Sequence, residues 1–195
     1  MSSAPNPPQF PPRPTSLAWS LLREVICKGD TVIDATAGNG HDTVFLAECV
    51  GPSGKVLAFD VQAAAILASS KRVEEQGHQR VVHFHLCSHD RMGEFAAPSS
   101  ISAIMFNLGY LPGEDHQITT RTSETLRALE TAELLLTKGG CLSIVCYPGH
   151  QAGAEEAQAV GHWLADKTKN GWRVANYSMI GTLRPAPFLL MARKE

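Results

Sequence analysis

Short apolar runs alternate with longer amphipathic segments along most of the chain. Five apolar runs have the length and composition of buried strands, at residues 31–34, 55–60, 81–86, 101–107 and 141–147. Helix-like segments separate or flank them, at residues 15–27, 44–50, 62–76, 119–136 and 154–169. Strand–helix–strand order produces parallel strands with right-handed crossovers. The pattern therefore predicts an α/β fold with a mostly parallel sheet.

Two further strand-like runs close the sequence without a helix between them. They cover residues 172–179 and 186–192 and are joined by a short, turn-rich segment. Consecutive strands with a short connection pair antiparallel. We therefore expect a seven-stranded, mostly parallel sheet whose last strand is antiparallel.

Composition divides the chain into a tail and one domain. Residues 1–14 are rich in proline and predict a flexible, extended tail. Residues 15–195 have a length that suits a single domain with a substantial core. The formal net charge is −2, so no global basic field attracts nucleic acid, and an RNA partner would need a local patch.

Cysteine spacing and hydropathy indicate the cellular compartment of the protein. The five cysteines form no C-x-x-C pair and sit in apolar runs or at helix ends, which is typical of reduced thiols. No apolar run approaches the roughly 20 residues that span a bilayer, and no signal-peptide pattern opens the chain. We expect a cytoplasmic protein without a membrane partner.

A glycine turn, D-A-T-A-G-N-G-H-D-T at residues 34–43, follows the first strand. Gly38 and Gly40 permit positive φ and close backbone approach, so their amides could face a ligand. Dinucleotide-binding turns carry a third glycine beneath the pyrophosphate, whereas Thr43 occupies that position here. The turn therefore favours an adenosine ligand without a pyrophosphate, such as S-adenosylmethionine.

Acidic and amide side chains surround this turn. Asp34 could accept from the ammonium of the ligand, directly or through water, while Asn39 and Asp42 line the same turn. Asp42 could instead cap the next helix. Asp60 ends the second strand, where a carboxylate can accept from both ribose hydroxyls; its alternative is a surface acid at a helix start. Gln62 is a weaker candidate beside it.

The ends of the next strands supply further candidates. Ser88 and His89 follow the third strand, and their position places them near an adenine. His83 and His85 share one strand face, but without a third ligand they predict no metal site.

The fourth strand ends in N-L-G-Y-L-P-G, residues 107–113. Methyltransferases that act on planar nitrogens often carry Asn-Pro-Pro-Tyr here, with the asparagine carbonyl accepting from the target amine. Asn107 and Tyr110 occupy the matching positions, and Asp115 follows as a possible proton relay. The alternative for this segment is a glycine-rich turn, and for Asp115 a solvated loop.

Taken together, these motifs resemble the YtqB-like family, long labelled rRNA methylases. The resemblance rests on D-A-T-A-G-N-G-H-D-T, A-F-D-V-Q, S-H-D, F-N-L-G-Y-L-P-G and Y-P-G-H and extends over residues 19–193. It implies a Rossmann-like class I S-adenosylmethionine-dependent methyltransferase. The cofactor contacts that it implies are Asn39, Asp42, Asp60, Gln62, Ser88 and His89, and the 107–113 loop would face the methyl acceptor.

The resemblance further implies N-methylation of the 5-aminomethyl group of the wobble 2-thiouridine, with the tRNA anticodon region as partner. Glu114, in place of a second glycine, and Pro148, in place of histidine, depart from the family pattern on the acceptor side. A homodimer would enlarge the surface offered to an anticodon arm. The alternatives are an rRNA or small-molecule amine methyltransferase and, more remotely, a nicotinamide-dependent oxidoreductase or a non-catalytic nucleotide-binding module.

Overall fold

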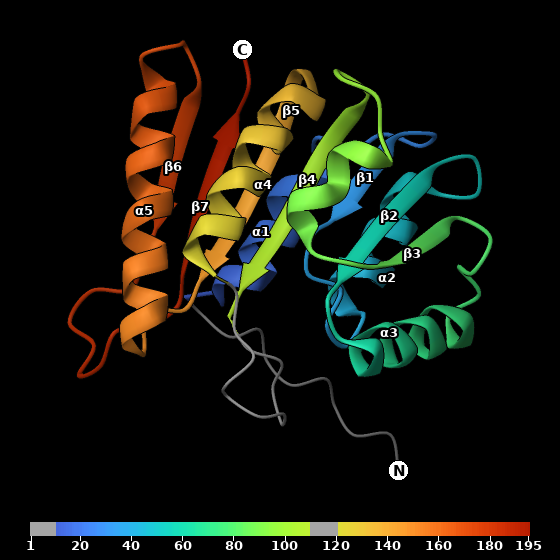
Figure 1. Ribbon diagram of the computed structural model, residues 1–195, viewed down its shortest axis with the longest axis horizontal. Helices are drawn as coiled ribbons and strands as arrows, with labels where there is room; N and C mark the ends of the chain where they lie inside the picture. Colours follow the sequence, from blue (N-terminus) through green and yellow to red (C-terminus); the bar gives the residue numbers. More distant parts are fainter. Residues whose placement is uncertain (1–10, 110–120) are drawn as a thin grey trace.

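Seven strands form one sheet in the order β3-β2-β1-β4-β5-β7-β6, with helices on both faces (Figure 1). The computed structural model describes residues 11–109 and 121–195. The strands are β1 (Thr31–Asp34), β2 (Lys55–Asp60), β3 (Val82–Leu86), β4 (Ile101–Leu108), β5 (Leu136–Cys146), β6 (Arg173–Tyr177) and β7 (Phe188–Arg193). The helices are α1 (Pro14–Arg23), α2 (His41–Val50), α3 (Ala63–Glu75), the 3₁₀ helix η1 (His89–Glu94), α4 (Thr122–Leu135) and α5 (Gln151–Thr168).

The sheet is parallel except at β7, as the sequence predicts. Strand β7 pairs antiparallel with both β5 and β6 and lies between them. Its apolar side chains explain this central position, because Leu189, Leu190 and Ala192 are all buried. The expected fold class is therefore confirmed.

Two hydrophobic clusters, one on each face of the sheet, hold the helices in place. One contains Leu22 of α1 and Phe45 of α2, and the other contains Met92 of η1, Leu129 of α4 and Leu164 of α5. In Figure 1, η1, α4 and α5 lie in front of the sheet and α1 and α2 behind it. Both faces are covered, which explains why the parallel strands are continuous apolar runs.

Strands β1 and β4 lie side by side in the sheet, and the strand order changes direction between them. Strands β2 and β3 follow on the other side of β1, and β5 follows on the other side of β4. The chain leaves β1 toward α2 on one face and leaves β4 toward α4 on the other. Open α/β sheets bind ligands at such a switch point, outside the carboxyl ends of the strands. The fold therefore directs the loops after β1, β2, β3 and β4 to one edge.

Two expectations about elements were wrong. The fifth strand was expected to begin at residue 141, but β5 begins at Leu136, directly after α4, and Gly139 lies inside the strand with φ +81°. Its amide donates to the Lys194 carbonyl at 2.7 Å, so this glycine belongs to an irregular strand start. The second error is η1, because no element was expected between the third and fourth strands.

The end of the predicted proline-rich tail contacts the domain. Helix α1 begins at Pro14, where a fixed φ and a missing amide proton suit the first turn. The Tyr177 hydroxyl of β6 donates to the Pro12 carbonyl at 2.9 Å, which holds the chain just before α1 against the sheet. The remainder of the predicted tail, residues 1–10, lies outside the described residues.

Candidate active site

A cavity of about 650 Å³ lies at the carboxyl edge of the parallel strands. Segments from every part of the switch point contribute to its wall: the start of α1, the β1 turn, and the ends of β2, β3, β4 and β5. The predicted residues that line it are Gly38, Asn39, Asp42, Asp60, Gln62, Ser88, His89 and Asn107. Most of the predicted cofactor residues are thus brought together.

Asp60 is fixed by two backbone amides. Gly38 N donates to one carboxylate oxygen and Gln62 N to the other, each at 2.9 Å. Gly38 reaches this geometry with φ +50°, a conformation that glycine adopts readily. Each oxygen of Asp60 can accept further bonds, so the carboxylate is oriented and still available to a pair of hydroxyls. The Gly38 amide, which we expected to face the ligand, instead orients Asp60.

Gly40 does not line the cavity, which corrects its predicted role. Its amide donates to the Ala37 carbonyl at 2.8 Å, and its φ is +80°. A Cβ at this position would lie 2.7 Å from Ser69 Oγ and 2.8 Å from Ser69 Cα. Glycine is therefore required by the close approach of α3 to the β1 turn.

Asp34 is also absent from the cavity wall. It is fully buried and accepts from Thr43 Oγ1 at 2.6 Å and from the Thr36 amide at 3.1 Å. Burial, and to a lesser extent the nearby charge of Asp42, raises the pKa of Asp34 to about 7. The expected direct contact with a ligand ammonium does not fit this position; Asp34 instead joins β1 to the first turn of α2.

Asp42 lies at the centre of a polar chain beside the cavity. It accepts from Trp19 Nε1 at 2.6 Å and from Asn107 Nδ2 at 3.1 Å. Burial raises the pKa of Asp42, while the bonds from Trp19 and Asn107 oppose that rise. The alternative of a helix cap is not formed, since no side chain caps α2 and its N-cap position is Gly40.

His89 presents one ring nitrogen to the backbone and one to the interior. Its Nδ1 lies 3.1 Å from the Ala35 carbonyl, which can only accept, so Nδ1 carries the proton and Nε2 has a lone pair. Nε2 is buried and has no partner in the described part of the chain. Burial lowers the pKa of His89, which favours the neutral ring. His89 therefore keeps a buried acceptor atom that no group in the described part of the chain occupies.

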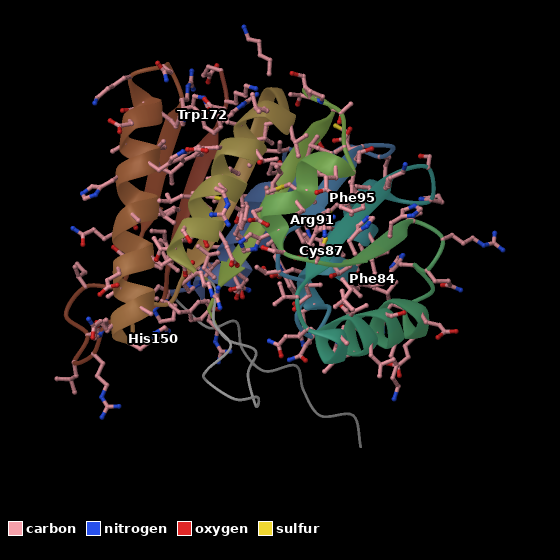
Figure 2. All side chains as sticks on the ribbon, in the orientation of Figure 1. Phe84, Cys87, Arg91, Phe95, His150 and Trp172 are labelled. Carbon is pink, nitrogen blue, oxygen red and sulfur yellow. The ribbon has the colours of Figure 1, made fainter. Side chains whose placement is uncertain are left out.

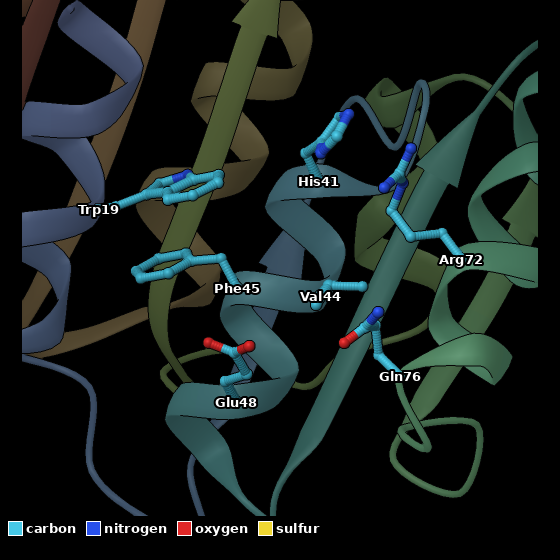
Figure 3. Close-up of a pocket in the computed structure, with 7 residues that line it drawn as sticks. All are labelled: Trp19, His41, Val44, Phe45, Glu48, Arg72 and Gln76. Atoms are coloured by element: carbon cyan, nitrogen blue, oxygen red, sulfur yellow. The ribbon is translucent and has the colours of Figure 1, made fainter. Parts of the chain in front are cut away.

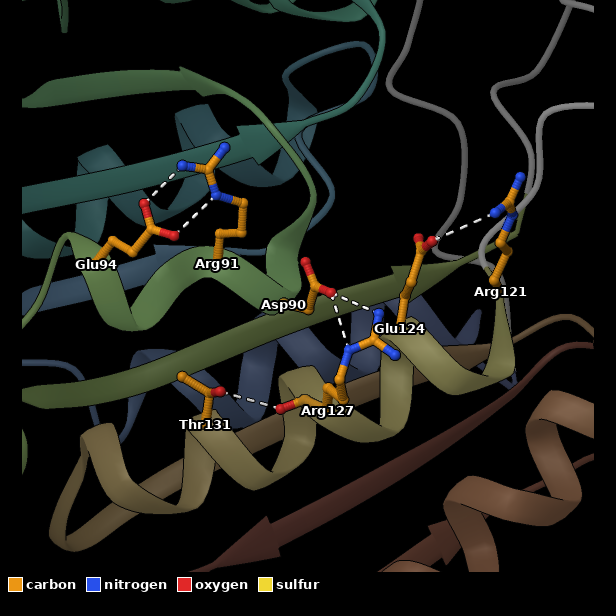
Figure 4. A network of polar contacts seen from close by, with 7 residues as sticks. All are labelled: Asp90, Arg91, Glu94, Arg121, Glu124, Arg127 and Thr131. Atoms are coloured by element: carbon orange, nitrogen blue, oxygen red, sulfur yellow. Dashed lines mark hydrogen bonds and ion pairs between the residues drawn. The ribbon is translucent and has the colours of Figure 1, made fainter.

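Ion pairs fix the 3₁₀ helix that carries His89 (Figure 4). Arg127 of α4 donates to Asp90 of η1 at 2.7 Å, and Arg127 holds the pKa of Asp90 below its usual value. Glu124, one turn earlier on α4, lines the cavity and lies 3.7 Å from Arg121. The α4 helix thus adds a carboxylate to the cavity wall that sequence reasoning did not identify.

A smaller hollow of about 130 Å³ adjoins the cavity and shares Trp19 and His41 with it. Figure 3 shows Trp19 of α1 above Phe45 of α2, with Arg72 of α3 on the opposite side. Arg72 Nε donates to the Asn39 carbonyl at 2.6 Å and so connects α3 to the glycine turn. The smaller hollow thus lies on the outer side of the wall that Trp19 and His41 form for the cavity.

His83 and His85 lie on the edge strand β3, where His85 packs against aromatic rings. His85 stacks on Phe59 at 4.8 Å and contacts Phe95 at 4.0 Å, both measured between ring centroids. Figure 2 labels Phe95 and Cys87, which follow and precede η1 in the chain. Over residues 11–109 and 121–195, no group of three or more His, Cys, Asp and Glu side chains could hold a metal ion.

Two predicted residues cannot be compared with the structure, and some residues of the cavity were not predicted from the sequence. Tyr110 and Asp115 lie outside the described residues. The cavity residues outside the candidate segments are Arg13, Thr15, Trp19, Cys87 and Glu124. Trp19 belongs to the helix-like segment at residues 15–27, where only its indole N–H signals a polar role.

The cavity fits S-adenosylmethionine in size, charge and hydrogen bonding. Its volume lies within the usual range for small-molecule sites, about 300–1,000 Å³. Asp42, Asp60 and Glu124 line it, and carboxylates suit a ligand that carries a sulfonium and an ammonium group. The Asp60 carboxylate, held by two backbone amides, keeps lone pairs that suit the two hydroxyls of a ribose.

A family model described as "Putative rRNA methylase" matches residues 56–193. The chain is 38% identical over 192 residues to an Arabidopsis thaliana protein named tRNA (mnm(5)s(2)U34)-methyltransferase, chloroplastic. That match covers 93% of this chain and 69% of the relative.

Solved structures agree with the fold and the cofactor. A "putative rRNA-methylase" of Clostridium thermocellum is 35% identical, with a TM-score of 0.90, over 94% of this chain and 98% of that one. A "putative methyltransferase" of Streptococcus mutans in complex with SAH is 33% identical, with a TM-score of 0.84, over 94% and 98%. In the described part of this chain no helix is long and apolar enough to cross a membrane.

Proposed function

The chain belongs to the rRNA methylase family and is an S-adenosylmethionine-dependent methyltransferase, and we propose that it N-methylates the 5-aminomethyl group of the wobble 2-thiouridine in tRNA. The observation that carries the proposal is the Asn107 carbonyl oxygen. It is buried beside the cofactor cavity and has no partner among the described residues. A carbonyl acceptor at the end of β4 suits an amine nucleophile, which has N–H groups to donate.

S-adenosylmethionine supplies a methyl group that its sulfonium activates for displacement. The task of the protein is to align the amine with that methyl group and to exclude water. Asn107 Oδ1 accepts an N–H of the amine and so directs the nitrogen lone pair along the line of attack. Gly109 and Tyr147, at the ends of β4 and β5, line the same cavity beside Asn107.

The amine must be neutral to attack. A primary alkyl ammonium resembles lysine and is largely charged at neutral pH. Burial disfavours the charged form, and Tyr147, whose own pKa is raised by burial, adds apolar surface to the cavity wall. Desolvation in the cavity therefore favours the reactive form, and the leaving proton can pass to solvent.

Nucleoside analysis of tRNA tests this function. Purified protein and isotopically labelled S-adenosylmethionine are incubated with tRNA that carries the unmethylated 5-aminomethyl nucleoside, and the digest is examined by mass spectrometry. We expect labelled 5-methylaminomethyl-2-thiouridine in tRNA and no label in rRNA. Label in rRNA, or in neither RNA, would overturn the proposed substrate, and label in rRNA would favour the activity in the family description.

Replacement of Asp60 tests the cofactor half of the site. Asp60→Ala removes the carboxylate that accepts from Gly38 and Gln62 and could bind the ribose. We expect the affinity for S-adenosylmethionine, measured by calorimetry, to fall by roughly 100-fold or more, since several hydrogen bonds to a charged group are lost. Asp166→Ala, on the exposed surface of α5, is the control and leaves affinity unchanged. Wild-type affinity in Asp60→Ala would refute the ribose assignment.

The remaining parts of the proposal concern partners and compartment. We propose that a second copy of the chain enlarges the RNA-facing surface and that the protein acts in the cytoplasm. Free cysteines in the described part of the chain, two of them at least partly accessible, support a reducing compartment. Sedimentation with and without tRNA tests the dimer, and a monomer at all concentrations would reject it.

A further inference from the structure

Three side chains from three elements form a hydrogen-bonded chain that ends at the methyl-acceptor side of the cavity. Trp19 Nε1 of α1 donates to Asp42 Oδ1 at 2.6 Å, and Asn107 Nδ2 of β4 donates to Asp42 Oδ2 at 3.1 Å. Asn107 Oδ1 is buried and has no partner in the described part of the chain. Each carboxylate oxygen of Asp42 thus binds one donor.

We propose that Trp19 and Asp42 are positioning residues that hold the Asn107 amide with its carbonyl oxygen toward the methyl acceptor. The proposal rests on the proposed function for the identity of that acceptor. The arrangement itself depends only on the three side chains and the cavity that Trp19, Asp42 and Asn107 all line.

The orientation of Asn107 follows from hydrogen-bond chemistry. An ionised carboxylate has no donor, so Asp42 can bind only the NH₂ end of the amide. The opposite orientation would place Oδ1 against a carboxylate oxygen and turn the NH₂ group to the cavity, where it would repel an amine N–H. The Asn107 backbone amide also donates to Thr36 Oγ1 at 2.8 Å, which fixes the base of the side chain.

Packing fixes Trp19 and hence the direction of its N–H. The indole stacks on Phe45 of α2 with centroids 5.0 Å apart and an interplanar angle of 3°. Arg23 of α1 lies on the same phenyl ring, with its guanidinium carbon 5.1 Å from the centroid. The donor is therefore held by α1 and α2 together, and little conformational freedom is lost when its bond to Asp42 forms.

The hydrogen-bonded chain of Trp19, Asp42 and Asn107 is sensitive to protonation of Asp42. Protonated Asp42 could donate to Asn107 Oδ1 and so stabilise the reversed amide. The titratable groups that act on or respond to Asp42 are Asp34 on β1, His41 on α2 and Tyr147 at the end of β5, and Arg13 lines the same cavity. The bond from Trp19 lowers the pKa of Asp42 and so extends the productive orientation to lower pH.

Trp19→Phe tests the donor while it keeps an aromatic ring on Phe45. At neutral pH we expect kcat to fall by roughly 10- to 100-fold, as for a misplaced reacting group, with the Kd for S-adenosylmethionine unchanged. The acid limb of the pH profile of kcat should move to higher pH, because Asp42 has lost a stabilising donor. Trp163→Phe is the matched control, because the Trp163 indole on α5 packs on Trp172 and takes no part in the hydrogen-bonded chain. An unshifted acid limb would overturn the role of Trp19.

Asp42→Asn tests the acceptor. Its carbonyl can still accept from Trp19, but its NH₂ group then faces Asn107 and favours the reversed amide. We expect a larger loss of kcat than in Trp19→Phe, without an acid limb from residue 42. Equal cooperativity of unfolding in the two variants and the wild type shows that the fold is intact. Wild-type kcat in Asp42→Asn would overturn the proposal.

A measurement without substrate separates this proposal from the proposed function. The Trp19 indole N–H resonance should titrate with Asp42 in the wild-type protein and lose that transition in Asp42→Asn. If the resonance titrates but no tRNA product forms, the proposed function fails and the hydrogen-bonded chain stands. If the resonance is the same in both proteins at every pH, Trp19 does not donate to Asp42 and the proposal fails, whatever the substrate.

Discussion

At the scale of single residues, two buried carboxylates, Asp34 and Asp42, organise the candidate site. Asp34 is fully buried and Asp42 nearly so, and each accepts two hydrogen bonds from within the chain. Buried polar groups are tolerated when they are hydrogen-bonded, and here those bonds connect β1, α1 and β4 to the helix that follows the glycine turn. Asp34 thus organises the site from behind the cavity wall, and Asp42 from within that wall.

Asp34→Asn should change how stability depends on pH. The pKa of Asp34 is about 7 in the folded protein, against 3.8 for an ordinary aspartate, because burial disfavours its charge. Between these values the folded state holds the proton more tightly than the unfolded state, so stability falls as pH rises from 3.8 through 7. The substituted asparagine side chain is neutral at every pH, and the Thr43 hydroxyl can accept from its NH₂ group.

We therefore expect the variant to gain stability relative to the wild type across this interval. Urea unfolding at a series of pH values measures the two free energies. A constant difference between wild type and Asp34→Asn throughout the interval would contradict the raised pKa of Asp34.

At the scale of elements, close backbone contacts decide which residues the turns require. Helix α3 lies so near the β1 turn that Ser69 occupies the space of a side chain at position 40. Arg72, one turn later on α3, donates to the Asn39 carbonyl. The glycine turn is therefore shaped from outside by α3 as well as by its own sequence.

Gly40→Ala and Gly77→Ala separate backbone strain from this contact. Both glycines have positive φ, +80° and +76°, but nothing lies within 4 Å of a Cβ at Gly77. We expect Gly77→Ala to cost about 1–2 kcal/mol from its left-handed backbone, and Gly40→Ala about 1–3 kcal/mol more from overpacking against Ser69. Urea denaturation gives both values, and equal losses would mean that α3 yields to the added methyl group.

At the scale of the whole molecule, the order of strands turns local motifs into a site. The switch between β1 and β4 gathers the loops of four parallel strands at one edge, where the cavity lies. The family and the glycine turn both argue against the oxidoreductase alternative, because a dinucleotide-binding turn would carry a glycine at the Thr43 position. Ligand binding at this edge should stabilise the entire domain.

Thermal unfolding with two nucleotides tests this linkage. S-adenosylmethionine at 100 times its Kd should add about 2.7 kcal/mol to the free energy of unfolding, which appears as a higher Tm. NAD at the same concentration should leave Tm unchanged, because the β1 turn lacks a site for a pyrophosphate. A comparable rise with NAD would contradict the assignment of the cavity.

The local sequence pattern determined much of the fold and the edge of the sheet at which the site lies. Strand and helix order, the antiparallel β7, and the gathering of Asp60, His89 and Asn107 at one edge all follow from periodicity and from where each strand ends. The start of β5 did not, because its glycines resemble a helix end and only pairing with β4 and β7 keeps the chain extended.

Tertiary structure alone decided how the site residues are used. Trp19 reaches Asp42 across 23 residues, Asn107 reaches Asp42 across 65, and Asp60 takes the amide of Gly38 across 22. Hydropathy and turn chemistry report what a residue does with its near neighbours in sequence. They placed Asp42, Asp60 and Asn107 at one edge of the sheet, but not Glu124. Which donor meets which acceptor depends on how α1 and the strand ends pack, and that is fixed only when the chain is folded.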